Sequence, residues 1–194
     1  DESRPTTIKQ KFRSKGKSLL RVNHLHQDAI NSSLQDKISK IIESVIQDVD
    51  LLVFSDFNYG CLPQLLVDKL IKLANVNNVM LAADSQSSSQ IGDISRFKGV
   101  NLITPTEREA RISSRNHEDG LVVLAQQLKK LSSTDHIFLK MGEEGMLIYY
   151  GNANGNELLT DSISALNISP RDVAGAGDHF LAMFGVGVWG AQMG

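Results

Sequence analysis

Residues 172–180 have the sequence DVAGAGDHF, which combines a run of very small residues with a carboxylate on each side. Gly175, Ala176 and Gly177 carry almost no side-chain bulk, so their backbone amides can approach a ligand closely. An apolar, helix-like segment follows, and the free N–H groups of a first helical turn, with the positive end of the helix dipole, favour a bound anion. We therefore expect these three residues to form an anion hole.

Asp178 needs a separate explanation, because a carboxylate in the first helical turn would repel a bound phosphate. In phosphoryl transfer to an alcohol both kinds of group are useful. Amides stabilise the charge on the moving phosphoryl group, and an aspartate orients or deprotonates the attacking hydroxyl. Asp178 is then the predicted catalytic base. A positioned base contributes about 10²–10⁴ in rate, whereas a carboxylate at a helix N-terminus adds only about 0.3–1 kcal/mol of stability.

Two other interpretations of this loop stay open. In a purely structural one, Asp172 is a helix N-cap and Asp178 complements the helix dipole, and for Gly-Ala-Gly alone this interpretation is favoured. A dinucleotide-binding loop would need a preceding strand and an acidic residue about 20 positions further along, which falls beyond Gly194.

The rest of the chain alternates predicted strands and helices. Strands are predicted at 51–56, 79–84, 100–104 and 136–140, and helices at 34–49, at 62–75, from Glu107 and at 118–131. The strand at 51–56 is apolar enough to be fully buried, and Ser33 is the expected cap of the first helix. The alternation predicts an α/β fold with a mostly parallel sheet and helices on both faces. Ligands bind such sheets at the carboxyl ends of the strands, where Asp56, Asp84, Thr104 and Lys140 fall.

Two hairpins and a short apolar segment complete this pattern. Residues 5–23 predict a polar, basic β-hairpin at an edge or forming a flap. After Lys140, the segment 146–150 is expected to turn through 152–156 into a strand at 157–160. The apolar segment 180–190 is too short for a membrane span of about 20 residues and is expected to be a buried helix.

Composition narrows the class of protein. The length of 194 residues and hydrophobic content of 41% predict one globular domain, 1–194, and the net charge of −2 gives no case for nucleic acid or a membrane as partner. Cys61 is the only cysteine, which excludes an internal disulfide and fits a cytoplasmic location. A small-molecule partner is expected. Because the first residues are polar and there is no initiator Met, we expect the natural chain to extend beyond both ends.

With its flanking aspartates, DVAGAGD resembles the second signature of the ribokinase-like (PfkB) sugar kinases, and other segments resemble the heptose-7-phosphate kinase branch. RPTTIKQKF and LLRVNH resemble its hairpin, SDFNYG its Ser-Asp-Tyr turn, ITPTEREA its Thr-Pro-Asn-x-x-Glu segment and KMGEEGMLIYY its nucleotide-side turn. The resemblance spans nearly the whole chain. It implies a three-layer α/β/α ribokinase-like fold in which 34–194 form the nucleotide and catalytic part.

The resemblance also implies roles for individual residues. Asp178 is the base, and the backbone of 175–177 is the anion hole. Asp172 would support that loop, the nucleotide and the metal, and Glu109 would organise Mg²⁺ around the phosphates of ATP. Lys140, Gly142 and Gly145 match the strand end and turn along the nucleotide, although a lone Gly-x-x-Gly after a strand is usually only a hairpin turn.

Several positions depart from the family pattern. Thr106 replaces Asn, Tyr59 replaces Lys in the Ser-Asp-Tyr-x-Lys-Gly turn, and Ser85-Gln86 replace Pro-Lys. Two expected phosphate-binding cations are therefore missing, and the candidates to replace them are Lys9, Lys11, Arg13 and Lys98. The family's Gly-Asp turn and Gly-Gly-x-x-Asn stretch, which hold the sugar, are expected upstream of Asp1.

The leading hypothesis is thus an enzyme that transfers the γ-phosphoryl group of Mg-ATP to a hydroxyl of a sugar or sugar phosphate, heptose 7-phosphate first, with a homodimer left open. The departures at Thr106, Tyr59 and Gln86 motivate the alternative, a catalytically weak kinase-fold module that binds nucleotide or a partner. A nucleoside or vitamin kinase of the same superfamily is a further option.

Overall fold

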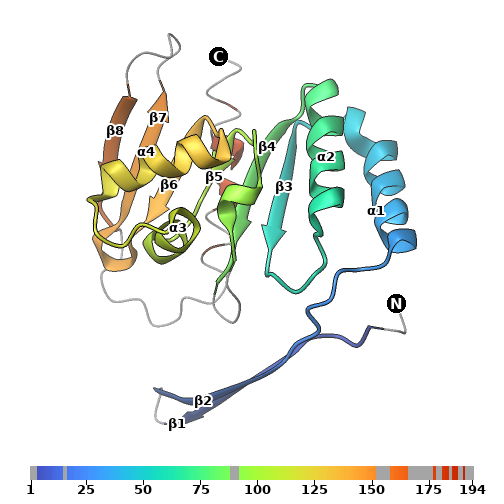
Figure 1. Cartoon of the computed structure of the whole chain (residues 1–194), viewed down its shortest axis with the longest axis horizontal. Helices are drawn as coiled ribbons and strands as arrows, with labels where there is room; N and C mark the ends of the chain where they lie inside the picture. Colours follow the sequence, from blue (N-terminus) through green and yellow to red (C-terminus); the bar gives the residue numbers. More distant parts are fainter. Residues whose placement is uncertain are drawn as a thin grey trace.

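The computed structural model describes residues 4–14, 17–87, 92–151, 158–165, 177, 181–183, 185–187 and 190 (Figure 1). Its strands and helices are β1 (Ile8–Ser14), β2 (Lys17–His24), α1 (Ser32–Val45), β3 (Leu51–Asp56), α2 (Gln64–Val76), β4 (Met80–Ser85), β5 (Leu102–Ile103), α3 (Glu107–Ser114), α4 (Leu121–Ser132), β6 (His136–Lys140), β7 (Met146–Gly151) and β8 (Leu158–Ile163). Short 3₁₀ turns lie at Ile46–Asp48, Ile94–Arg96 and Gly142–Glu144.

The main sheet has the strand order β3-β4-β5-β6-β7-β8. Strands β3 to β6 are parallel, and β6, β7 and β8 are antiparallel. The arrows of β3, β4 and β6 point to the lower edge of the sheet in Figure 1. This arrangement confirms the predicted mostly parallel sheet and the predicted hairpin after Lys140.

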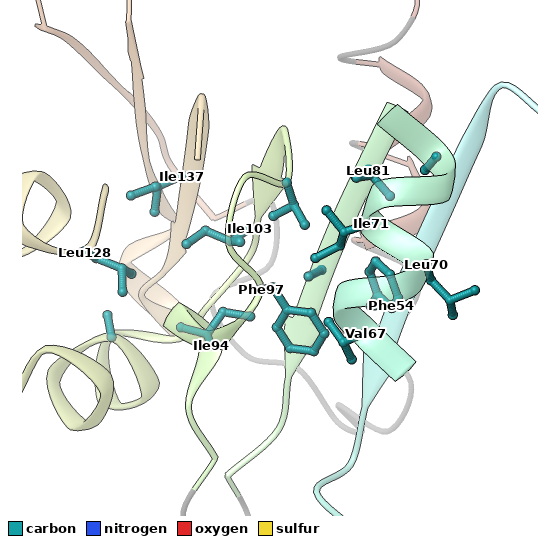
Figure 2. Close-up of a cluster of buried hydrophobic side chains, with 14 of the residues drawn as sticks. Phe54, Val67, Leu70, Ile71, Leu81, Ile94, Phe97, Ile103, Leu128 and Ile137 are labelled. Carbon is teal, nitrogen blue, oxygen red and sulfur yellow. The ribbon is translucent and has the colours of Figure 1, made fainter. Parts of the chain in front are cut away.

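Side chains of successive strand residues divide between the two faces of the sheet, as the pleat requires. On β4, Leu81 and Ala83 belong to the large core cluster, whereas Ala82 belongs to a smaller cluster on the opposite face. On β6, Ile137 faces the large cluster and Phe138 the smaller one. Figure 2 shows the large cluster, in which apolar residues of α2 and α4 pack on the strands.

The opposite face of the sheet is covered by the helical segment near the C-terminus. Leu181 is buried in the smaller cluster, and a Cβ on helical Gly185 would lie 3.0 Å from Leu51 Cδ2. Met183 and Val186 are 60% and 59% exposed, so the expectation of a buried helix is wrong at these positions, because one side of the segment faces away from the sheet. Helical segments on both faces confirm the three-layer α/β/α fold.

Strand β3 is less buried than predicted. Only Phe54 and Asp56 are buried, and Val53 is 37% exposed. The prediction of a fully buried strand is wrong because, among the described strands, β3 pairs only with β4 and so lies at the edge of the sheet. The predicted strand at 100–104 is shortened to Leu102–Ile103.

Two helix starts also differ from the predictions. Asn31, not Ser33, caps α1, since its side chain accepts a hydrogen bond of 2.9 Å from the Leu34 amide. Helix α4 begins at Leu121 rather than at residue 118. The Asn116 side chain accepts hydrogen bonds from the amides of Glu118 and Asp119, and this local turn competes with the helix.

The predicted N-terminal hairpin is confirmed as a separate two-stranded antiparallel sheet. All seven residues of β1 are exposed. In Figure 1 the hairpin extends below the edge of the main sheet at which the parallel strands end. Among the residues that the structure describes, no helix is long and apolar enough to cross a membrane.

His136, at the start of β6, gives a prediction on stability. Burial lowers the pKa of this imidazole, and Lys129 lowers it further, while Asp135 opposes them. A folded-state pKa below the unfolded value of 6.5 means that the unfolded chain binds the proton more tightly, so stability falls as the pH drops below that value. We expect the melting temperature to decrease from pH 7 to pH 5.5, and to decrease less in His136→Gln. An unchanged slope in the variant would contradict this cause.

Candidate active site

Three strand ends meet in a buried polar cluster at the carboxyl edge of the sheet. The Lys140 ammonium lies 3.0 Å from Asp84 Oδ1, and the Thr104 hydroxyl donates to the same oxygen at 3.2 Å. The side chains of Lys140 and Asp84 are only 18% and 3% exposed. Because β5 separates β4 from β6, Lys140 reaches across the end of a strand to its partner. The parallel order of the strands thus joins groups that are 56 positions apart in the sequence.

The charge on Asp84 is held in an unfavourable environment. Burial raises the pKa of the Asp84 carboxyl, and the nearby Glu109 carboxylate raises it further. The charge and hydrogen bond of Lys140 and the hydroxyl of Thr104 act in the opposite direction, but burial is the largest cause. Asp84, Glu109 and Lys140 together have one more carboxylate than ammonium, so this cluster favours the binding of a further cation.

Gly177 connects the cluster to the predicted anion hole. A Cβ placed on this helical residue would lie 3.7 Å from Asp84 Oδ2 and 3.7 Å from Lys140 Nζ. One predicted anion-hole residue therefore lies directly beside the strand-end ion pair. Asp172, Gly175, Ala176 and Asp178, the other residues predicted in this loop, lie outside the described residues.

Glu109, the predicted magnesium organiser, is buried at the start of α3. Its carboxylate accepts hydrogen bonds from the amide of Thr106 at 2.8 Å and from the amide of Ser87 at 3.0 Å. In return, the Thr106 hydroxyl accepts from the Glu109 amide, which completes a capping box. The family's Asn is therefore replaced by a residue that still caps the helix, and Glu109 ties that helix to the segment after β4.

The carboxylates of Asp84 and Glu109 have the ligand chemistry that the predicted Mg²⁺ requires. Mg²⁺ usually keeps several waters and binds one or two carboxylates plus phosphate oxygens, rather than a cage made of protein ligands alone. Asp84 and Glu109 supply two carboxylates at one edge, and each oxygen of Glu109 that accepts an amide retains a second lone pair. Within the described ranges, no group of three or more metal-ligating side chains occurs.

A groove of about 700 Å³ opens beside the cluster, between α3 and the turn after β6. It is lined by Thr106, Glu107, Arg108, Arg111, Ile112, His117, Lys140, Met141 and Gly142. Two residues predicted to follow the nucleotide, Lys140 and Gly142, thus line one cavity. Arg111 is paired with Glu107 at 2.8 Å, whereas the exposed Arg108 adds a cationic side chain to the lining.

Gly145, the third residue predicted to follow the nucleotide, is required by the fold itself. Its φ is +96°, and a Cβ there would overlap the Ile163 carbonyl oxygen on β8. This contact explains why a glycine is needed at position 145, as expected if the Gly-x-x-Gly motif only forms a hairpin turn. Gly145 is not among the residues that line the groove.

On the other side of the cluster, the loop after β3 is held by a buried ion pair. Asp56 Oδ2 lies 2.7 Å from Arg96 Nη2, which also donates to the Leu62 carbonyl at 3.0 Å. Asn58 donates to Ser85 Oγ at 3.1 Å, one residue after Asp84. No sequence pattern indicates Arg96 as a partner of Asp56, and Asp84 is expected at the edge without an assigned role. The signals for Asp84 are its position at the end of a predicted strand and the family pattern, in which an aspartate precedes the Pro-Lys that Ser85-Gln86 replace.

Comparison with known proteins shows the family to which this fold and sequence correspond. Residues 2–188 match the family model described as pfkB family carbohydrate kinase. The chain is 28% identical over 185 residues to the bifunctional protein HldE of Helicobacter pylori strain Shi470, covering 94% of this chain and 38% of that protein. It is 29% identical over 191 residues to HldE of a Nitratiruptor species, covering 96% of this chain and 38% of that protein.

Solved structures with the same fold are more distant in sequence. The tetrameric inhibited form of phosphofructokinase-2 from Escherichia coli superposes with a TM-score of 0.69 at 13% identity. The superposed region covers 89% of this chain and 55% of the phosphofructokinase chain. Ribokinase from Giardia lamblia gives a TM-score of 0.64 at 20% identity, covering 91% and 53%. These structures show the fold. The chain spans just over a third of the length of the HldE relatives that it matches.

Proposed function

The chain belongs to the PfkB family of carbohydrate kinases, and from this we propose that it transfers the γ-phosphoryl group of ATP to a hydroxyl of a sugar or sugar phosphate. The observation that carries the proposal is the position of Gly177 beside the Asp84–Lys140 pair at the carboxyl edge of the sheet. There, an anion hole and a fixed ammonium would act on the same phosphate group. Similarity to HldE makes heptose 7-phosphate the first acceptor to test.

In this proposal the protein groups divide the steps of binding and transfer among them. Lys140 lines the groove and would bind a phosphate of the nucleotide while Asp84 holds its ammonium in place. The amides of 175–177 would stabilise the charge on the phosphoryl group during transfer. Asp178, which follows Gly177 directly in the sequence, would accept the proton of the attacking hydroxyl.

Mg²⁺ would be held by Asp84 and Glu109, with Asp172 as the further predicted ligand. When bound, it supplies positive charge to the phosphates of ATP. Glu109 has a second task that needs no metal, because its hydrogen bonds to Thr106 and Ser87 hold the start of α3 against the end of β4.

Donor and acceptor are expected on opposite sides of Gly177. The groove beside β6 and α3 would take the nucleotide. Because the attacking and leaving oxygens lie roughly in line across the phosphoryl group, the acceptor would approach from the other side, where β3 ends. The loop 57–63 connects the end of β3 to the start of α2.

The proposal is tested with the intact protein, Mg-ATP and a panel of acceptors, by following formation of ADP. The panel contains heptose 7-phosphate, the unphosphorylated heptose, fructose 6-phosphate, ribose and a nucleoside. We expect turnover with a sugar or a sugar phosphate. Turnover with the nucleoside alone would assign the chain to a different branch of the superfamily.

The Gly177→Ala variant tests the anion hole without a large change in the fold. A Cβ at 3.7 Å from Asp84 and Lys140 is an ordinary contact, so the variant should fold normally, but the methyl group would occupy space that faces the ion pair. We expect turnover to fall about 10-fold or more, since loss of one oxyanion contact can cost about 10²–10³. Gly187→Ala is the matched control, because nothing lies within 4 Å of a Cβ there. Equal activity of the two variants would place the phosphoryl group elsewhere.

A further inference from the structure

A lysine of the hairpin lies over two aromatic rings of the main body. Lys9 Nζ is 5.3 Å from the ring centroid of Phe57 and 4.9 Å from that of Tyr59. The two rings are stacked, with centroids 6.3 Å apart and an interplanar angle of 22°. Both distances are within the range of a cation–π interaction, which gives the ammonium a preferred position although all of β1 is exposed.

The aromatic pair is fixed to the end of the sheet by Asn58, which lies between the two rings in the sequence. Asn58 has a left-handed φ of 58°, and its amide donates to Asp56 Oδ1 at 2.9 Å. Its side-chain amide donates to Ser85 Oγ at 3.1 Å and to the Gln86 carbonyl at 2.6 Å. The rings are therefore held beside the segment that follows Asp84.

The same loop is also tied to the base of the hairpin. The Arg4 guanidinium donates to the carbonyl oxygens of Tyr59 and His26. The Gly60 carbonyl accepts a 3.0 Å hydrogen bond from the Ile30 amide, and a Cβ on Gly60 would overlap the Asp28 carbonyl oxygen. These contacts bring β1, and with it Lys9, over the end of β3.

This position is on the acceptor side of the proposed site. Among the described residues, no carboxylate forms an ion pair with Lys9. An ammonium that is placed by aromatic faces keeps its hydrogen-bond donors available for an anionic ligand. Tyr59 also stands where the resemblance expects a lysine, so the aromatic ring places a hairpin cation close to the position of the missing one.

We propose that Lys9, held over Phe57 and Tyr59, binds the phosphate of a phosphorylated acceptor sugar and so sets the preference for sugar phosphates over free sugars. This inference rests on the proposed kinase function. In this inference Lys9 of the hairpin binds the phosphate of the acceptor. Lys140, on the other side of Gly177, binds a phosphate of the nucleotide.

The experiment compares Lys9→Met, Lys9→Arg and Lys11→Met in the intact protein. Lys11 is the matched control, because it lies two residues along the same exposed strand and so points to the same side. We expect Lys9→Met to raise KM for heptose 7-phosphate about 10- to 100-fold, as for a lost charged hydrogen bond, with kcat within about twofold. KM for the unphosphorylated heptose should not change. Lys9→Arg should restore most of the selectivity, and Lys11→Met should behave as the wild type.

A binding measurement separates this inference from the proposed function. Without ATP, heptose 7-phosphate is titrated while the ring resonances of Tyr59 and Phe57 are followed by NMR. Saturable shifts in the wild type and in Lys11→Met, lost in Lys9→Met, support the subsite even if no acceptor is phosphorylated. Equal titrations in the wild type and Lys9→Met, or an unchanged KM for the sugar phosphate, overturn it and leave the kinase assignment standing.

Discussion

The Asp178→Asn variant is expected to turn over about 10²- to 10⁴-fold more slowly than the wild type, while its melting temperature stays within a few degrees of the wild-type value. The asparagine keeps the size of the side chain and removes its ability to accept a proton. A carboxylate at a helix N-terminus contributes only about 0.3–1 kcal/mol to stability, so the effect on folding should be small. Initial rates with Mg-ATP and the best acceptor, together with thermal melts, measure both quantities.

The control for this variant is Asp161→Asn, which removes a carboxylate from an exposed position on β8. Its turnover should equal that of the wild type. If Asp178→Asn retains full turnover and loses only stability, Asp178 is a helix-dipole residue, as the structural interpretation of the loop holds.

Breaking the Asp84–Lys140 pair should have the second largest effect. Lys140→Met leaves a buried carboxylate without its ammonium, and loss of one partner of a buried pair typically costs about 3–5 kcal/mol. Removal of Lys140 also removes the charge and the hydrogen bond that lower the pKa of Asp84, so the carboxyl takes up a proton more readily and part of that cost is relieved. Denaturant unfolding at pH 7 gives the free energy of unfolding.

The double variant Asp84→Asn/Lys140→Met separates folding from function. With both charges removed, we expect the free energy of unfolding to recover by at least about 1 kcal/mol relative to Lys140→Met, since contacting residues are not additive. ATP affinity should not recover, because Lys140 is proposed to bind a phosphate. Recovery of stability and ATP affinity together would show that the pair has only a structural role.

Much of the fold could be predicted because the hydrophobic pattern is strong where the chain is buried on both faces. The strands ending in Asp84 and Lys140 and the helix α2 were all expected close to their observed positions. The errors concern features that depend on neighbours. Asn31 and Ser33 are both good cap residues, and the sequence alone does not distinguish them. In the folded chain the Ile30 amide donates to the Gly60 carbonyl, and Asn31, the next residue, is the N-cap.

The site could be predicted only in part for a related reason. The rule that ligands bind at the carboxyl ends of parallel strands located Asp84 and Lys140, but their ion pair depends on the order of β4, β5 and β6 in the sheet. Nothing in the sequence around Arg96 indicated its partner Asp56, which is 40 positions away. Lys9 was one of four candidate cations, and only the folded chain places it on an aromatic pair.

The most direct test of the central claim is transfer of label from γ-³²P-ATP to heptose 7-phosphate by the intact protein with Mg²⁺. The account predicts a labelled sugar bisphosphate formed in a one-to-one ratio with ADP, at a rate that Asp178→Asn reduces by orders of magnitude. ATP-induced thermal stabilisation without label transfer to this or any other sugar of the panel would contradict it, and would instead identify a kinase-fold module that binds nucleotide without catalysis.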